Sequence, residues 1–100
     1  MEKSKPHYFL TEIKAIVARD GMAAFTATAR DGVMQLGISS HDALGIIAGL
    51  GNAMFYKSMT THMDHRIWQD VYCAPCPNGR TAYIKFTLRA GTIVIQFKEK

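Results

Sequence analysis

The 100-residue sequence lacks the features that mark several large classes of protein. No apolar run approaches the ~20 residues that a membrane-spanning helix needs. The polar start MEKSKP is not followed by the apolar core of a signal peptide. There is no internal repeat, no low-complexity segment and no glycine-rich phosphate-binding loop. We therefore expect a soluble, cytoplasmic protein that forms one domain over residues 1–100 and does not associate with a membrane.

Acidic residues are scarce in the second half of the chain. Residues 1–50 carry five Lys or Arg and five Asp or Glu, whereas residues 51–100 carry seven basic and three acidic ones. The net charge of +4 therefore comes entirely from the second half. Such an excess indicates that a polyanion or an acidic partner meets this part of the chain, although positive charge also serves solubility.

The first half of the chain has the periodicity of helices. Apolar residues at positions 9, 10, 13, 16 and 17 share one helical face and predict a helix that ends at Asp20-Gly21. A second helix is predicted to start at a cap on Thr26 or Thr28 and to end at Gly37. This half of the chain is predicted to be scaffold.

A third helix is predicted after a strong start signal. Ser39 and Asp42 have the spacing of a capping box, with Asp in place of the usual Glu. The helix expected at residues 43–50 is apolar nearly all round, so we expect it to be buried. Gly45 and Gly49 would let it lie close to a sheet.

Alternation of apolar and polar residues predicts a β-hairpin at the end of the chain. Its strands cover residues 81–89 and 92–98, joined at Ala90-Gly91. A turn centred between these two residues pairs positions whose numbers sum to 181. This register matches the apolar faces and sets Tyr83 opposite Lys98, with their Cβ atoms about 5 Å apart. The polar face carries Tyr83, Lys85, Arg89 and Lys98. We expect it to bind a ligand, although such faces also simply meet water.

Two further antiparallel strands are predicted at residues 55–61 and 67–72, joined by a polar turn at 62–65. Their alternation is less regular, which indicates that both faces are partly covered. The sequence thus predicts an α+β fold in which the helical first half packs on one side of an antiparallel sheet.

Aromatic, basic, amide and histidine side chains are interleaved from Met54 to Tyr72. Proteins hold nucleotides with such sets, because aromatic rings stack on bases and cations neutralise phosphates. The alternative is a β-rich segment whose aromatic residues pack into the core. Composition alone leaves both interpretations open.

Residues with metal-ligand chemistry offer rival sites. His62 and His65, followed by Cys73 and Cys76, make a possible two-His, two-Cys zinc set or, for the cysteines, a redox dithiol. Ordinary turn residues explain the same pattern, because the strand between the pairs does not guarantee their meeting. Either histidine could also be the base of a ribonuclease. We interpret Trp68 as a partly buried packing residue.

Three multi-residue blocks carry a family resemblance. They are FYKSMTT at residues 55–61, IWQDVY at 67–72 and the ending FKEK at 97–100. In this order and spacing they resemble MqsR, the motility quorum-sensing-regulator toxins of bacterial type II toxin–antitoxin pairs. The resemblance spans nearly the whole chain. It implies an mRNA interferase with a RelE-like ribonuclease fold, cleavage of mRNA at GC-containing triplets (typically GCU), and inhibition by a cognate MqsA-like antitoxin.

The resemblance also assigns site residues. The family's active-site lysine, glutamine, tyrosine and C-terminal lysine correspond here to Lys57, Gln69, Tyr83 and Lys98. The hairpin register places the last two side by side independently. The candidate RNA-binding residues are Tyr56, Lys85 and Arg89. Where relatives carry arginines after Tyr72, this chain has CAPCPNG, which puts RNA binding by that loop in question.

Lysines and a phenol suit RNA cleavage without a metal or other cofactor. The 2′-hydroxyl attacks the adjacent phosphorus and leaves a 2′,3′-cyclic phosphate and a 5′-hydroxyl, so two protons move and phosphate charge needs stabilising. We expect Lys57 and Lys98 to stabilise that charge, Tyr83 to transfer a proton or contact phosphate, and Gln69 to orient the RNA. Clustered lysines lower one another's pKa, so we expect Lys57 or Lys98 to be neutral often enough to accept a proton. The alternatives are a module that binds RNA without cutting it and a regulator that docks an antitoxin on the same face.

Overall fold

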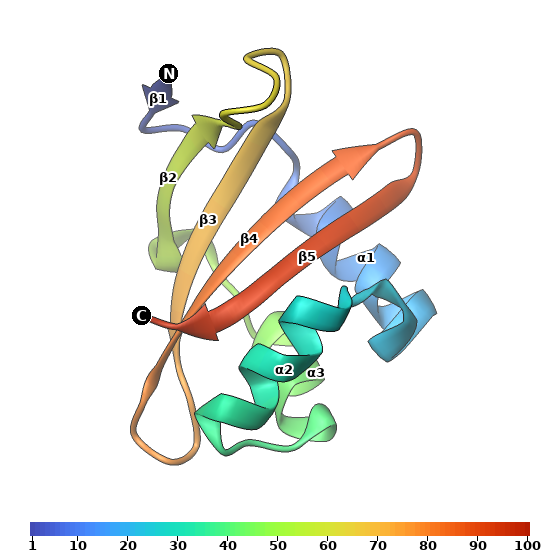
Figure 1. The fold of residues 1–100 in the computed structure, drawn as a ribbon, viewed down its shortest axis with the longest axis vertical. Coiled ribbons are helices and arrows are strands. Elements are labelled where there is room, and N and C mark those ends of the chain that lie inside the picture. Colours follow the sequence, from blue (N-terminus) through green and yellow to red (C-terminus); the bar gives the residue numbers. More distant parts are fainter.

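The computed structural model describes all 100 residues and consists of three α-helices and a five-stranded sheet (Figure 1). The helices are α1 (Leu10–Asp20), α2 (Ala27–Leu36) and α3 (Ser40–Ala48). The strands are β1 (Glu2–Lys3), β2 (Phe55–Thr60), β3 (Trp68–Pro75), β4 (Thr81–Arg89) and β5 (Thr92–Glu99). Two 3₁₀ helices lie at Gly21–Ala24 and Asn52–Met54. All strand pairs are antiparallel, in the order β1-β2-β3-β4-β5. The predicted α+β class is confirmed.

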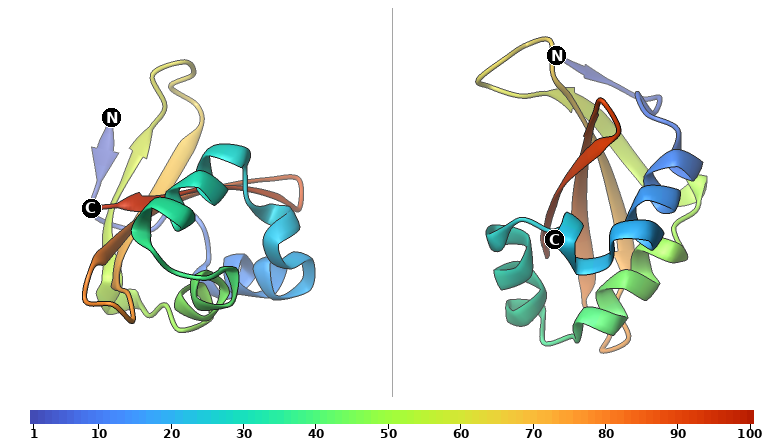
Figure 2. Two further views of the ribbon diagram at one scale, coloured as in Figure 1. Left: turned by 60° about the horizontal axis from the view of Figure 1, so that its bottom comes forward. Right: turned by 90° about the vertical axis from the view of Figure 1, so that its right-hand side faces the viewer.

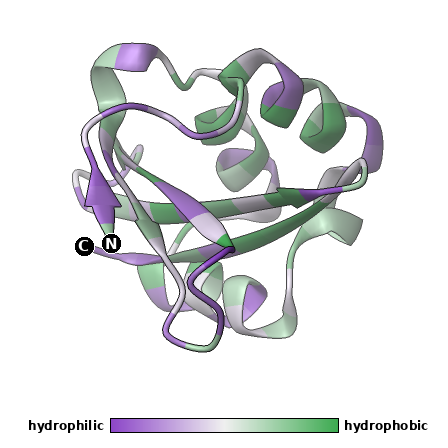
Figure 3. Cartoon of the chain, turned by 90° about the horizontal axis from the view of Figure 1, so that it is seen from above, coloured by the Kyte–Doolittle hydropathy of each residue, from purple (hydrophilic) through white to green (hydrophobic).

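One hydrophobic core joins the three helices to a single face of the sheet (Figure 2). The strands contribute Tyr72, Ala74, Ala82, Ile84, Phe86, Ile93, Ile95 and Phe97. The helices contribute Ile13, Ile16, Val17, Ala29, Val33, Leu36, Ala43 and Ile47. Figure 3 shows the apolar segments on the helices and long strands, with hydrophilic ones at β1 and both termini. No helix covers the opposite face of the sheet. No helix is long and apolar enough to cross a membrane.

The helix boundaries follow the predicted caps. Thr26 caps α2, because its hydroxyl accepts a hydrogen bond from the Ala29 amide at 3.0 Å. Gly37 ends that helix with a left-handed φ of 76°. Ser39 and Asp42 form the reciprocal capping box of α3, at 3.0 and 3.1 Å. These local signals are confirmed.

The burial predicted for the third helix is confirmed only in part. Ala43, Ile47 and Leu50 are buried, and Leu44 and Ile46 pack against the core while partly exposed. The remaining face of α3 is exposed to solvent, because the helix packs on α1 with one side only. A Cβ on Gly45 would meet nothing within 4 Å, so this glycine does not bring the helix close to the sheet. Gly49 lies at the C-terminal cap of α3, where an added Cβ would meet only carbonyl oxygens of the same helix.

The close helix–sheet approach lies instead at Gly32 of α2. A Cβ there would lie 1.7 Å from the carbonyl oxygen of Phe97. Because no side chain fits, the α2 backbone rests directly on β5. In Figure 1, α2 lies beside the C-terminal part of β5.

The C-terminal hairpin has the predicted register. Tyr83 pairs with Lys98, Ile84 with Phe97, and Phe86 with Ile95. Ala90 and Gly91 have φ values of 51° and 75°, as in the two-residue type I′ turn that suits a tight hairpin.

A buried carboxylate, Asp70 of β3, anchors the N-terminal segment. It accepts hydrogen bonds from the backbone amides of His7 (3.0 Å) and Tyr8 (2.8 Å) and from the Ser58 hydroxyl (2.6 Å). A fully buried carboxylate requires such partners. They hold residues 1–8 against the sheet, where β1 pairs with β2.

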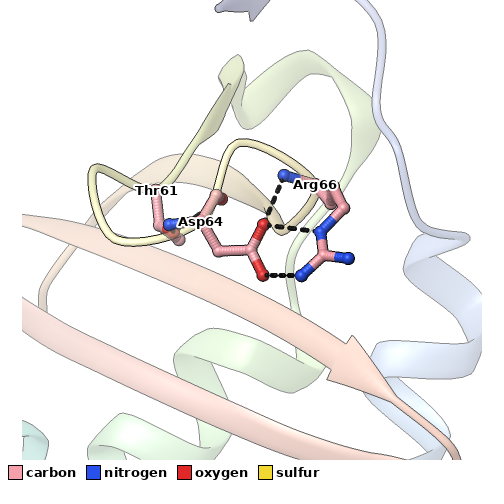
Figure 4. A network of polar contacts seen from close by, with 3 residues as sticks. All are labelled: Thr61, Asp64 and Arg66. Carbon is pink, nitrogen blue, oxygen red and sulfur yellow. Dashed lines mark hydrogen bonds and ion pairs between the residues drawn. The ribbon is translucent and has the colours of Figure 1, made fainter.

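A second carboxylate organises the loop between β2 and β3 (Figure 4). Asp64 accepts hydrogen bonds from the Arg66 guanidinium at 3.0 Å and from the Arg66 amide at 2.9 Å. The Thr61 hydroxyl accepts from the Asp64 amide at 3.0 Å. These hydrogen bonds from Arg66 lower the pKa of Asp64 to about 2.

Candidate functional site

Two tyrosines and four lysines gather on the sheet face opposite the core. The members are Tyr56 and Lys57 of β2, Tyr83 and Lys85 of β4, Lys98 of β5, and Lys100 just beyond it. We call this group the lysine–tyrosine cluster. Its centre is an edge-on contact between the two tyrosine rings, whose centroids lie 6.3 Å apart.

Each lysine of the cluster lies near a tyrosine ring. The Nζ atoms of Lys98 and Lys85 are 5.3 and 5.9 Å from the Tyr83 ring centroid. Those of Lys57 and Lys100 are 5.4 and 5.5 Å from the Tyr56 centroid. These distances are typical of cation–π contacts, so the rings help to hold four positive charges in one place.

Strand register explains how distant residues meet. Val71 of β3 pairs with Lys57 on one side and with Lys85 on the other. Residues directly opposite in a sheet share a face, so both lysines flank Val71. Val71 is fully buried although it lies on the site face. Lys57 and Lys85 are placed to cover it, because lysines lay their aliphatic stems along apolar surface and keep the charge in water.

A β-bulge adds Tyr56 to the cluster. Phe55 pairs with Tyr72 and Lys57 with Val71, so Tyr56 is an extra residue in β2. Strict alternation would turn Tyr56 and Lys57 to opposite faces. The bulge breaks that alternation, which lets both side chains join the cluster while Phe55 packs on Tyr72 in the core.

The electrostatics single out Lys85. Burial lowers the pKa of Lys85, and the positive charges of Lys98 and Lys57 lower it further. Lys57 has a counter-ion, since its Nζ lies 3.5 Å from the carboxylate of Glu2 on β1. A lysine with a lowered pKa is the member of the cluster best suited to accept a proton.

The structure brings most of the predicted site residues together. Lys57, Tyr83 and Lys98 all lie in the cluster. Gln69 shares their face but pairs with Met59, two residues along β3 from Val71. That is a step of about 7 Å, so Gln69 lies at the edge of the cluster.

The predicted RNA-binding residues separate into two places. Tyr56 and Lys85 belong to the cluster, whereas Arg89 lies at the far end of β4, six residues or about 20 Å from Tyr83. There Arg89 lines a second cavity with Arg66 and Asp64. Sequence reasoning missed Lys100, although its position two residues after Lys98 indicates the same face of an extended chain. It also missed Glu2, for which no local pattern exists.

The structure does not bring the four residues of the possible zinc set together. His62 and His65 are exposed in the loop before β3, whereas Cys73 and Cys76 lie at the other end of this strand. Trp68, at the start of β3, is already about 17 Å from Cys73, while zinc ligands lie about 2.3 Å from the ion. No group of three or more His, Cys, Asp or Glu side chains is placed to hold a metal ion. Cys76 is buried, which raises the pKa of its thiol.

Neither loop histidine lies in the cluster, so neither is placed to act as its base. Trp68 is partly buried and packs as predicted. The His7 ring stacks on it at 5.4 Å between centroids, and the Lys3 Nζ lies 4.1 Å from the centroid of the Trp68 ring.

Comparison with known proteins identifies a family and a relative that match nearly the whole chain. The family model described as motility quorum-sensing regulator, toxin of MqsA, matches residues 5–99. The mRNA interferase toxin MqsR of Escherichia coli strain K12 is 39% identical over 100 residues, which cover the whole of both chains.

Proposed function

The chain belongs to the family of motility quorum-sensing regulator toxins, and we propose that it acts as an mRNA interferase, the endoribonuclease toxin of a toxin–antitoxin pair. The observation that carries this proposal is the full-length similarity to an mRNA interferase toxin, together with four lysines gathered on one face. That face has the charge and the aromatic rings that bind an RNA backbone and its bases.

The reaction we propose is an internal transesterification of RNA. Lys85 in its neutral form takes the proton of the 2′-hydroxyl, and the 2′-oxygen then bonds to phosphorus. The bond from phosphorus to the 5′-oxygen breaks, and Tyr83 donates a proton to that oxygen. Lys57 and Lys98 stabilise the charge on the phosphate oxygens. The products are a 2′,3′-cyclic phosphate and a 5′-hydroxyl.

The lowered pKa of Lys85 supports its assignment as the base. This proposal replaces the expectation that Lys57 or Lys98 transfers the proton. Gln69, at the edge of the cluster, would orient the RNA. The charged side chains of the cluster are lysines, and Mg²⁺ requires oxygen ligands. The proposed reaction therefore uses no metal.

The family assignment supports finer proposals. We assign residues 1–100 to one toxin domain of the RelE-like ribonuclease fold, in keeping with the antiparallel sheet and its helices. The substrate would be mRNA in the cytoplasm, cut at GC-containing triplets, typically GCU. The neutralising partner would be an MqsA-like antitoxin, because the family is described as the toxin of MqsA.

Incubation of the purified protein with a GCU-containing RNA in chelator tests the proposal. We expect discrete fragments with 5′-hydroxyl ends, and a Lys98→Ala variant should cut at least 100-fold more slowly because a phosphate-stabilising charge is lost. Its residual activity should rise at higher pH than that of the wild type, since Lys98 helps to lower the Lys85 pKa. Lys5→Ala removes the same charge outside the cluster and should cut normally.

A mobility shift without cleavage would instead support an RNA-binding module. Normal cleavage by Lys98→Ala would remove that lysine from the mechanism.

A further inference from the structure

A cavity of about 300 Å³ opens between α2 and the β4–β5 hairpin. Three members of the lysine–tyrosine cluster line it: Tyr83, Lys85 and Lys98. The other lining residues are Gln96 and Phe97 of β5 and Thr28, Asp31, Gly32 and Gln35 of α2. Its volume falls at the lower end of the range for small-molecule sites. A planar group bound here would lie beside the atoms to which we assign the chemistry.

The helical wall of the cavity is one face of α2. Its four residues are at positions 28, 31, 32 and 35, and the i, i+3, i+4, i+7 spacing places them on one side of a helix. Gly32 in this row presses the helix backbone against β5, where a Cβ would lie 1.7 Å from the Phe97 carbonyl oxygen. The wall is thereby held at a fixed distance from the sheet. A pre-formed cavity of this kind lowers the entropic cost of binding.

Asp31 is the one acidic residue of the cavity, and its carboxylate has no polar partner in the free protein. It makes no ion pair within 4.0 Å and no side-chain hydrogen bond. The side chains of Gln35 and Gln96 are likewise exposed and unbonded. A negative charge beside lysines weakens phosphate binding, so binding of the RNA phosphate backbone does not explain why an acid lies here. A carboxylate is an acceptor, and it suits a ligand that offers hydrogen-bond donors.

We infer that this cavity binds a guanine base next to the scissile phosphate and that Asp31 reads it. The inference rests on the proposed function and names a specificity residue for it. Guanine presents two adjacent donors, N1–H and the 2-amino group, which match the two oxygens of a carboxylate. Adenine, cytosine and uracil each present a single donor group next to at least one acceptor, and that acceptor would face the negative charge.

The neighbouring side chains complete the match. Guanine O6 is an acceptor beside N1–H, and the amide groups of Gln35 and Gln96 supply donors at the cavity wall. The rest of the nucleotide would extend toward Lys85 and Lys98, which bind its phosphate. Base and phosphate would thus be held by opposite charges, a division of labour typical of nucleic-acid recognition.

Inosine substitution tests the inference with the intact protein. Inosine lacks the 2-amino group but keeps N1–H, so two short RNAs are compared that differ only by guanosine or inosine in the preferred triplet. In single-turnover assays the wild type should cut the inosine RNA about tenfold more slowly, because one hydrogen bond to a charged acceptor is lost. Asp31→Asn should cut the guanosine RNA about tenfold more slowly and should lose the difference between the two RNAs.

Glu12→Gln is the matched control, because it removes one negative charge from an exposed site on α1. It should keep both the rate and the guanosine preference. An Asp31→Asn variant with the wild-type ratio of guanosine to inosine cleavage would overturn the inference and leave the nuclease assignment standing. If the wild type cuts the guanosine and inosine RNAs at the same rate, the inference is also overturned, whatever the variants do. Absence of all cleavage by the wild type would refute the proposed function and the inference with it.

Discussion

Substitution of Lys85 by Met should lower the rate of RNA cleavage and raise the stability of the protein. The Nζ atoms of Lys85 and Lys98 lie 5.9 and 5.3 Å from the same ring centroid, so their separation is at most the sum of the two, 11.2 Å. At that distance two unit charges repel by roughly 0.4 kcal/mol at a dielectric constant of 80 and by about 1.5 kcal/mol at 20. Met retains most of the side-chain volume without the charge. We therefore expect Lys85→Met to raise the free energy of unfolding by about 0.5–1 kcal/mol at low salt.

The stability gained by Lys85→Met should become smaller at high salt and at high pH. Screening by 1 M salt, with a Debye length of about 3 Å, should remove most of it. The folded state lowers the Lys85 pKa below its ordinary 10.5, so the unfolded chain binds that proton more tightly. The charged form therefore destabilises the wild type below the lowered pKa, and this cost disappears as pH rises toward 10.5. The advantage of Lys85→Met should be largest near neutral pH.

Urea unfolding at two salt concentrations and two pH values measures these changes, and RNA cleavage measures the activity. The rate should fall by about 10²–10⁴ if Lys85 is the base. Lys5→Met, which removes the same charge from an exposed residue outside the cluster, should leave both quantities nearly unchanged. A Lys85→Met protein that cuts RNA at the wild-type rate, or that is less stable at low salt, would refute the reasoning.

Two core positions give further predictions. The Tyr72 hydroxyl is buried without a hydrogen-bond partner, so Tyr72→Phe should raise the free energy of unfolding by about 1 kcal/mol in urea titrations. Burial raises the Tyr72 pKa to about 12, so the wild type loses stability as pH rises through 10 to 12 and the gap should widen there. A less stable Tyr72→Phe would mean that the hydroxyl has a partner. Gly32→Ala should lower the melting temperature, because overpacking against the Phe97 carbonyl costs about 1–3 kcal/mol. Gly45→Ala, which faces open space in α3, should raise it instead by removing a helix-interior glycine.

The sequence was sufficient where short-range rules decide the structure. The β4–β5 register follows from a two-residue turn and a matched apolar face, and a slip of one residue would turn Phe86 and Ile95 out of the core. The cap at Thr26 and the capping box at Ser39 likewise depend on neighbours three residues away. These features needed no knowledge of the tertiary fold.

Features that depend on tertiary packing were not predictable in the same way. Tyr56 joins the cluster only because of the bulge in β2, whose position depends on how Phe55 packs on Tyr72. Four glycines lie in α2, in α3 or at their C-caps, and nothing local distinguishes Gly32 as the one that touches the sheet. Asp31 could be named as a candidate site residue only after the structure showed that α2 and Lys85 line the same cavity.

The buried side of β3 influences the charge balance of the site on its other side. Asp70 binds the amides of His7 and Tyr8 and so fixes the segment that leads back to β1. β1 in turn brings the Glu2 carboxylate to 3.5 Å from Lys57. Exposed ion pairs of this kind contribute about 0–1 kcal/mol. Under the proposed function, an RNA phosphate would therefore displace Glu2 from Lys57 at little cost. The anchoring of the N-terminal segment would then set part of the charge that the RNA meets.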